Sequence, residues 1–255
     1  MLDTKNRIKR IEARYGRKVW GPRAVYRLAD NAVKKRKPVS IIRLGDVMAK
    51  LLARRQVKSL NYVSQFLGVK LPPSPRLQND LEQSVKHSDL VGLSHYPSSI
   101  GQLKAYMRKS GWKPRRIADS FVNDLMYKNG YLHKLMRSHR VALVGRAAPA
   151  AAARLRKLGY RIVMTCTLDH YNEMERVLGK LKRRRHEYDL VLVGASVPGR
   201  ILCTKIKRRL GRSAIEIGHM MDALAKPSDW KRKGDVRRTV KFRWMRKLKA
   251  RSKKK

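Results

Sequence analysis

Short runs of apolar residues alternate along the chain with longer stretches in which apolar and polar positions follow a helical period. The runs are rich in Val, Ile and Leu, and several end in glycine, as buried strands do. They lie at residues 39–44, 90–93, 141–144, 160–164, 190–193 and 214–217. The pattern predicts a strand at each of these six places.

The stretches between the runs predict helices. Helical spacing is clear after residue 46, around 81–85, and over 100–107, 117–127, 131–136, 147–157, 171–184 and 200–210. Gly159 and Gly211 follow two of these stretches at the position where glycine commonly ends a helix. The pattern over residues 3–35 also predicts helices, interrupted near Gly16 and Gly21.

Strands that alternate with helices at this spacing favour parallel β-α-β units with right-handed crossovers. We therefore predict an α/β fold with a mostly parallel, Rossmann-like sheet and helices on both faces. The predicted domain covers residues 38–227. A basic helical N-terminal extension at 1–37 and a basic C-terminal tail at 228–255 flank it.

The net charge of the chain indicates which class of molecule the protein binds. The chain has 63 Lys and Arg against 18 Asp and Glu, a formal net charge of +45. Only part of this excess lies in the tail, where residues 226–255 hold 15 Lys or Arg and two Asp. Such a charge indicates association with a polyanion, such as nucleic acid, an anionic membrane or an envelope polymer, or a solvated basic surface without a partner.

The remaining composition bounds the location. Cys166 and Cys203 are too few for a disulfide framework or a four-ligand zinc site. The N-terminus lacks the apolar segment of a signal peptide, and no run of about 18 apolar residues could span a bilayer. We expect a cytoplasmic protein, with Phe242 and Trp244 of the tail allowing peripheral contact with an anionic membrane surface.

Glycine-containing turns follow four of the predicted strands. In parallel sheets, ligands bind at the carboxyl ends of strands, where helix starts present N–H groups to phosphate. We expect these turns to form one cleft for a nucleotide diphosphate, although a glycine after a strand can also serve the turn alone. The candidate binding residues are Arg43, Gly45, Gly145, Arg146, Gly194, Ser196, Gly199 and Gly218.

Two further side chains are candidates for catalysis. Asp46 could hold a divalent cation or orient a sugar hydroxyl, but its spacing favours a residue that caps the start of a helix. His219 could bind phosphate or act as an acid or base, although a single histidine at a strand end is more often structural. No His-x-x-x-His pair, nucleophile elbow or Cys/His cluster is present, which argues against hydrolase and zinc-enzyme classes.

The order of these motifs resembles a known family. Residues 40–46, Ser-Ile-Ile-Arg-Leu-Gly-Asp, resemble the S-[IV]-[IV]-R-[FIL]-G-D-G-E signature of the bacterial GT-D-fold glycosyltransferases. Four more segments of this family have similar counterparts here, at residues 89–93, 140–145, 188–195 and 216–219. The resemblance extends over residues 38–222.

The resemblance implies transfer of a sugar from a nucleotide diphosphate sugar, UDP-glucose or a relative, to a glycan or glycoprotein acceptor, assisted by a divalent metal such as Mn or Mg. Asp46 matches the first acid of the family's Asp-x-Glu motif, and Arg43 matches the arginine before it. Met48 stands in place of the second acid. A thioether is a poor ligand for a hard cation, so the metal motif is altered.

A second interpretation is a non-catalytic protein that binds a polyanion on a degenerate glycosyltransferase fold. The basic composition is compatible with either interpretation. No RNP-like aromatic motif is present, which argues against sequence-specific reading of nucleic acid.

Overall fold

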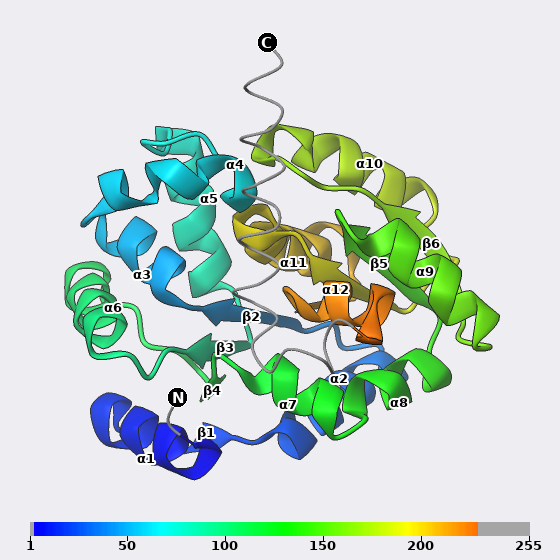
Figure 1. Cartoon of the computed structure of the whole chain (residues 1–255), viewed down its shortest axis with the longest axis horizontal. Helices are drawn as coiled ribbons and strands as arrows, with labels where there is room; N and C mark the ends of the chain where they lie inside the picture. The colour runs from blue at the N-terminus through cyan, green and yellow to red at the C-terminus, as the bar shows by residue number, and fades with distance from the viewer. Residues whose placement is uncertain (1–2, 229–255) are drawn as a thin grey trace.

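The computed structural model describes residues 3–228, so the tail prediction, apart from residue 228, lies outside the described residues. Eight parallel strands form one sheet in the order β1-β4-β3-β2-β8-β7-β5-β6 (Figure 1). They are β1 (Val19–Trp20), β2 (Ser40–Leu44), β3 (Leu90–Leu93), β4 (Ile117–Asp119), β5 (Val141–Gly145), β6 (Ile162–Cys166), β7 (Leu190–Gly194) and β8 (Ser213–Glu216).

The predicted α/β class is confirmed, and each of the six predicted strands is present in the sheet. The last strand, β8, pairs with β2 on one side and with β7 on the other. The last strand in the sequence therefore lies at the centre of the sheet, between the half that contains β1 to β4 and the half that contains β5 to β7. A change of direction of this kind in the strand order leaves a crevice at the carboxyl ends of the central strands.

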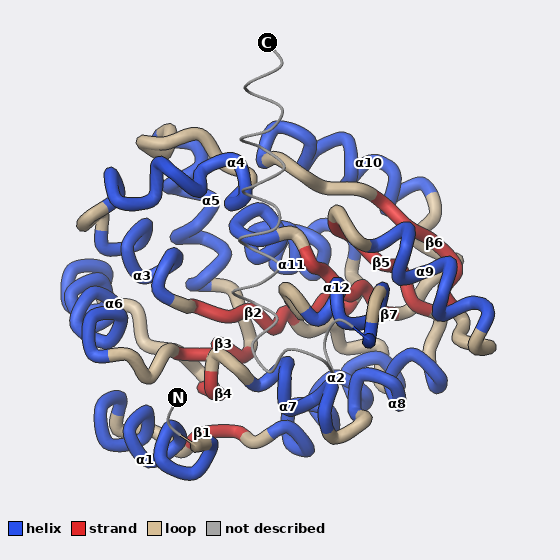
Figure 2. Tube along the Cα trace, viewed as in Figure 1, coloured by secondary structure: helices blue, strands red, loops and turns tan. Residues whose placement is uncertain are grey.

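Side chains of successive strand residues enter two different cores because a strand alternates its faces. Ile42 and Leu44 of β2 belong to one buried cluster, and Ile41 belongs to the other. Helices cover both faces, as Figure 2 shows. On the Ile42 side the helical segments are α1 (Thr4–Tyr15), α3 (Asp46–Ala53), η1 (Val57–Val63), α4 (Ser64–Leu67), α5 (Pro75–Lys86), α6 (Pro97–Ser110), α10 (Met174–Arg183) and α11 (Ser196–Leu210).

The helices of the opposite face pack against Ile41 and its neighbours. They are α2 (Pro22–Lys34), α7 (Val122–Lys128), α8 (Tyr131–Ser138), α9 (Ala148–Lys157) and α12 (Met220–Ala225). A single-turn 3-10 helix, η2 (Tyr171–Glu173), precedes α10. Within residues 3–228, no helix is long and apolar enough to cross a bilayer.

The N-terminal segment is helical and also completes the sheet. Its strand β1 pairs in parallel with β4, and its side chains Ile11, Val25 and Ala29 are fully buried. The predicted helix over residues 117–127 is wrong in its first part, where β4 occupies Ile117–Asp119 and α7 begins only at Val122. A strand of three residues is too short to reveal a period in the sequence.

Candidate functional site

A pocket of about 330 Å³ opens at the carboxyl ends of the central strands, where the fold leaves its crevice. Segments from the turns after β2, β5, β7 and β8 line it, together with η1, α4 and the loop after β6. Most of the predicted binding and catalytic residues lie in its wall. These are Arg43, Asp46, Arg146, Gly194, Ser196, Gly218 and His219.

The other three predicted glycines shape the turns and do not line the pocket. Gly145 has a φ of 144°, and a Cβ there would overlap the carbonyl of Gly194, so glycine lets the ends of β5 and β7 lie together. Gly199 lies in the first turn of α11, where a Cβ would stand 3.0 Å from Cγ1 of Val193. Gly45 caps α3, and its carbonyl accepts from the N–H of Ala49 at 3.0 Å.

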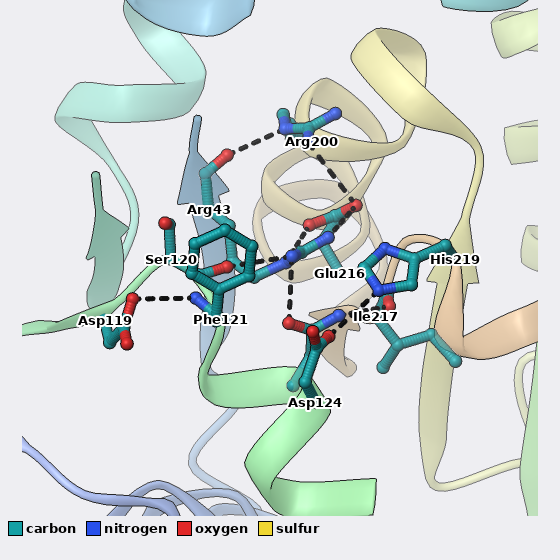
Figure 3. Close-up of polar contacts among 10 residues, drawn as sticks. Arg43, Asp119, Ser120, Phe121, Asp124, Arg200, Glu216, Ile217 and His219 are labelled. Carbon is teal, nitrogen blue, oxygen red and sulfur yellow. Dashed lines mark hydrogen bonds and ion pairs between the residues drawn. The ribbon is translucent and has the colours of Figure 1, made fainter. Parts of the chain in front are cut away.

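Arg43 forms part of the pocket floor and is buried. Its Nε donates to Oε2 of Glu216 at 2.7 Å, and its Nη2 donates to Oε1 at 3.1 Å. Its Nη1 donates to the carbonyl of Ser120 and to Oδ1 of Asn123, both at 2.9 Å (Figure 3). The guanidinium is therefore occupied by protein partners, which makes Arg43 an organiser of the floor.

Glu216 ends β8 and is 1% exposed. Burial alone raises the pKa of such a carboxyl, but the adjacent charges of Arg200 and Arg43 outweigh it and hold the Glu216 pKa below its usual value. Arg200 donates from Nε to the carbonyl of Arg43 at 2.7 Å, and its Nη2 lies 3.8 Å from Oε1 of Glu216. Two arginines thus share one buried carboxylate beneath the pocket.

The turn after β8 is fixed against Arg43 and α7. Gly218 has a φ of 52°, and a Cβ there would collide with Nη2 of Arg43. Asn123 donates from Nδ2 to the carbonyl of Ile217 at 2.7 Å. The next residue, His219, places its Nε2 3.0 Å from Oδ1 of Asp124, as Figure 3 shows. This contact holds the imidazole ring at the pocket in a set orientation.

Asp222 is a pocket residue that the sequence did not single out. It lies in the first turn of α12, one turn after His219. Burial raises the pKa of its carboxyl, and the charges of His219 and Arg146 only partly offset this effect. A carboxylate with a raised pKa is a stronger base than an ordinary one, which is the property that proton transfer requires.

An apolar and aromatic wall faces the charged floor. Tyr62 and Phe66, one helical turn apart on η1 and α4, line the pocket with Leu60, Val63 and Leu67. Tyr62 is 65% exposed, which is unusual for a large ring and suits stacking against a ligand. Sequence reasoning missed this wall because residues 57–67 are far from the strand ends in the chain, and only their folding places them there.

Cationic side chains and helix N-termini surround the pocket. Lys50 donates from Nζ to Oγ of Ser59 at 2.7 Å, and Arg146 donates from Nε to Oδ1 of Asp169 at 2.8 Å. The helices α3, α9 and α11 begin at the pocket, so their N-terminal N–H groups add positive potential. Ser196, at the start of α11, has a φ of 49°, a strained conformation of the kind that clusters at functional sites.

Charge in the pocket is balanced, unlike the chain as a whole. The described lining holds four cationic side chains, Arg43, Lys50, Arg146 and Arg200, and four acidic ones, Asp46, Asp169, Glu216 and Asp222. Paired charges around an aromatic wall are suited to a small ligand with defined polar groups. The excess positive charge of the protein therefore lies outside this pocket.

The described residues do not complete a site for a divalent metal. Asp46 is exposed at the start of α3, whereas the side chain of Met48 is fully buried in the core beneath that helix. Within residues 3–228, no three His, Cys, Asp or Glu side chains are grouped so that they could hold a metal ion. Asp46 therefore lacks the second oxygen ligand that its motif would supply.

Comparison with known proteins agrees with this fold. The family model described as a GT-D fold-like domain matches residues 20–224. A solved structure of domain of unknown function 1792, described as having a distinct glycosyltransferase fold, superposes with a TM-score of 0.59 at 14% identity, covering 89% of this chain and 86% of that one. A glycosyltransferase of this kind from Streptococcus sanguinis gives a TM-score of 0.55 at 16% identity, with coverages of 82% and 84%. No curated protein matches the chain.

Proposed function

The chain belongs to the GT-D-like family, and on that premise we propose that it is a glycosyltransferase that takes a sugar from a nucleotide diphosphate sugar, UDP-glucose or a relative. The acceptor in this proposal is a glycan or a glycoprotein. The observation that carries the proposal is one pocket that combines an aromatic wall, helix N-termini and paired charges at the carboxyl ends of parallel strands.

Each part of a nucleotide sugar has a suitable partner in this pocket. The diphosphate would lie against the starts of α9 and α11, within reach of Arg146 and Lys50. The base would stack on Tyr62 or Phe66. The sugar would then face Asp46, His219 and Asp222, whose oxygens and ring nitrogen can bind hydroxyl groups.

The chemistry requires one bond to form while another breaks. An acceptor hydroxyl oxygen attacks the anomeric carbon, and the bond from that carbon to the diphosphate oxygen breaks. Asp222, with its raised pKa, is the proposed base that takes the hydroxyl proton. Negative charge that develops on the leaving diphosphate is offset by Arg146, Lys50 and the helix N–H groups. In this proposal Asp46 and His219 orient the sugar hydroxyls.

A transfer assay with the full chain tests this proposal. UDP-glucose and related donors are incubated with a glycan mixture, and release of UDP is measured. Asp222→Asn should lower the rate at least about tenfold, as loss of a general base does. Glu175→Gln, an exposed acid on α10, is the matched control and should leave the rate unchanged. Full activity in Asp222→Asn would rule out this base.

A non-catalytic polyanion-binding function is the second candidate. The observation in its favour is the contrast between a net charge of +45 and a pocket with equal numbers of cationic and acidic side chains. Polyanion binding would then use other surfaces and could coexist with transfer. A protein that binds polyanions but no nucleotide sugar would favour this second function.

A further inference from the structure

A second cavity, which we call the basic groove, lies among the carboxyl ends of α3, α5 and α6. Its volume is about 750 Å³. Five cationic side chains line it, all exposed: Arg54, Arg55, Lys86, Arg108 and Lys109. Glu82 is the acidic residue of the described lining, and its Oε1 lies 3.3 Å from Nη2 of Arg54.

The negative ends of the three helix dipoles offset only part of the positive charge in the groove. Each helix C-terminus carries the equivalent of about half a negative charge, so three of them offset about one and a half positive charges. Five cations against one acid leave four, and about two and a half remain after this offset. Among residues 3–228, the side chains of Arg55, Lys86, Arg108 and Lys109 form no ion pair. The groove therefore has uncompensated charge available for an anion.

The backbone at the rim of the groove is strained. Arg54 has a φ of 54° and Gln56 has a φ of 55°, both in the left-handed region that costs a non-glycine residue about 1–2 kcal/mol. Gln102 of α6 donates from Nε2 to Oε1 of Gln56 at 3.3 Å and so braces the turn. Two strained residues on either side of Arg55 indicate that its position on the rim is maintained at some cost to stability.

The lining also restricts the kind of polyanion. Single-stranded nucleic acid binds grooves that offer exposed aromatic faces for its bases. The aromatic residue of the described lining is Tyr106, which is 4% exposed and buried against the floor. A concave space between three helices is also a poor match for a flat lipid surface. A groove without an exposed aromatic face is suited to a flexible chain that carries phosphates without bases.

We propose that the basic groove binds phosphate groups of a base-free, phosphate-bearing polymer chain. The position of the basic groove relative to the pocket suggests the role of the bound chain. Asp46, Val47 and Lys50 of α3 line the pocket, whereas Leu52 and Ala53 at the other end of this helix line the groove. An eight-residue helix is about 12 Å long, so one polymer can reach both. Resting on the proposed transferase function, the bound chain is the sugar acceptor.

Binding to defined polymers tests the groove directly. The full chain is titrated with a poly(glycerol phosphate) chain and with an oligothymidylate of the same phosphate number, at several salt concentrations. The groove variant carries Arg108→Glu and Lys109→Glu in the last turn of α6. The matched control carries Lys182→Glu and Arg183→Glu, two exposed cations in the last turn of α10.

The groove variant should bind poly(glycerol phosphate) at least about tenfold more weakly, and its slope of log affinity against log salt should flatten by about 1.5, because two phosphate contacts are lost. The control should change the affinity less than about twofold. Hydrogen exchange should show protection by the polymer at residues 52–56 and 105–110. Equal losses in the two variants, or protection elsewhere only, would overturn the groove assignment. Tighter binding of the oligothymidylate would show that the groove is a nucleic-acid site instead.

A second measurement separates this proposal from the transferase function. Affinity for UDP-glucose is compared between the wild type and the groove variant, and it should be the same in both because the pocket is intact. If the wild type binds the polymer in the groove but no nucleotide sugar, the groove stands and its role for an acceptor fails. If the nucleotide sugar binds to the pocket but the polymer does not bind in the groove, the groove proposal alone fails.

Discussion

Arg43 at the end of β2 and Glu216 at the end of β8 form a buried ion pair through two hydrogen bonds, of 2.7 and 3.1 Å. The two residues are 173 positions apart in the sequence, but they lie on adjacent strands. Because Arg200 also contacts Glu216 and the carbonyl of Arg43, this pair joins both halves of the sheet under the pocket. Its integrity should decide both the stability of the fold and the shape of the floor.

Glu216→Gln should destabilise the protein by about 3–5 kcal/mol, because it removes the carboxylate that pairs with the buried guanidinium of Arg43 and the half-buried one of Arg200. Urea unfolding at neutral pH measures this change. Glu175→Gln, in an exposed ion pair with Arg209, should cost no more than about 1 kcal/mol. Equal costs for the two variants would show that the buried pair has no special weight.

The difference between wild type and Glu216→Gln should depend on pH. The pKa of Glu216 is lower in the folded protein than in the unfolded chain, so its stabilising contribution is present above the unfolded pKa of about 4.3. It is lost as the pH falls through the lower, folded pKa. Unfolding free energies measured between pH 7 and pH 3 should therefore converge on the acid side, and a constant difference would contradict the assignment.

The contribution of Asp222 to stability should depend on pH in the opposite direction to that of Glu216. Its pKa is raised in the folded state, so the charged form opposes folding and this cost appears as the pH rises through the folded pKa. Asp222→Asn should therefore raise the melting temperature at pH 7 to 8, with a gain that disappears below the unfolded pKa. A variant less stable than the wild type at pH 8 would show that the charged carboxylate is stabilising instead.

Gly218→Ala should cost much more stability than Gly211→Ala. Both glycines have positive φ, 52° and 61°, so both substitutions introduce about 1–2 kcal/mol of backbone strain. A Cβ at Gly211 meets no atom within 4 Å, whereas one at Gly218 collides with the Arg43 guanidinium. Chemical denaturation should therefore show at least twice the loss for Gly218→Ala, together with weakened nucleotide binding.

Met48→Glu should not restore a metal site. Met48 is fully buried in the core, so a carboxylate there should destabilise the protein by about 3–5 kcal/mol as an unpaired buried charge. Met48→Leu, which conserves volume, should cost less than about 1.5 kcal/mol. A stable Met48→Glu variant that binds Mn²⁺ would show that residue 48 can turn toward the pocket.

The strands of the fold were predictable where apolar runs are long enough to show a pattern, as at 141–144 and 190–193. The two shortest strands were not, because β1 and β4 have two and three residues and depend on pairing with their neighbours. Burial of Ile11 and Val25 was equally hidden, since a helix rich in Lys and Arg looks like an exposed extension.

The candidate site was predictable at the strand ends, where glycine turns mark the loops that meet in a parallel sheet. Arg146, Ser196 and His219 do line one pocket with Asp46. The roles of Glu216 and Asp222 depend on burial and on neighbouring charges, which no local pattern contains. The Tyr62 wall comes from a segment without strand or turn signals, although two aromatic residues one helical turn apart were a hint.

The most direct test of the central claim is a calorimetric titration of the full chain with UDP-glucose in the presence of EDTA, repeated with Arg146→Ala. The account predicts saturable binding without metal, weakened about tenfold or more in the variant because a charged hydrogen bond to phosphate is lost. Absence of binding to the wild type, or binding that appears only when Mn²⁺ is added, would contradict a pocket that meets the diphosphate with arginine, lysine and helix N-termini.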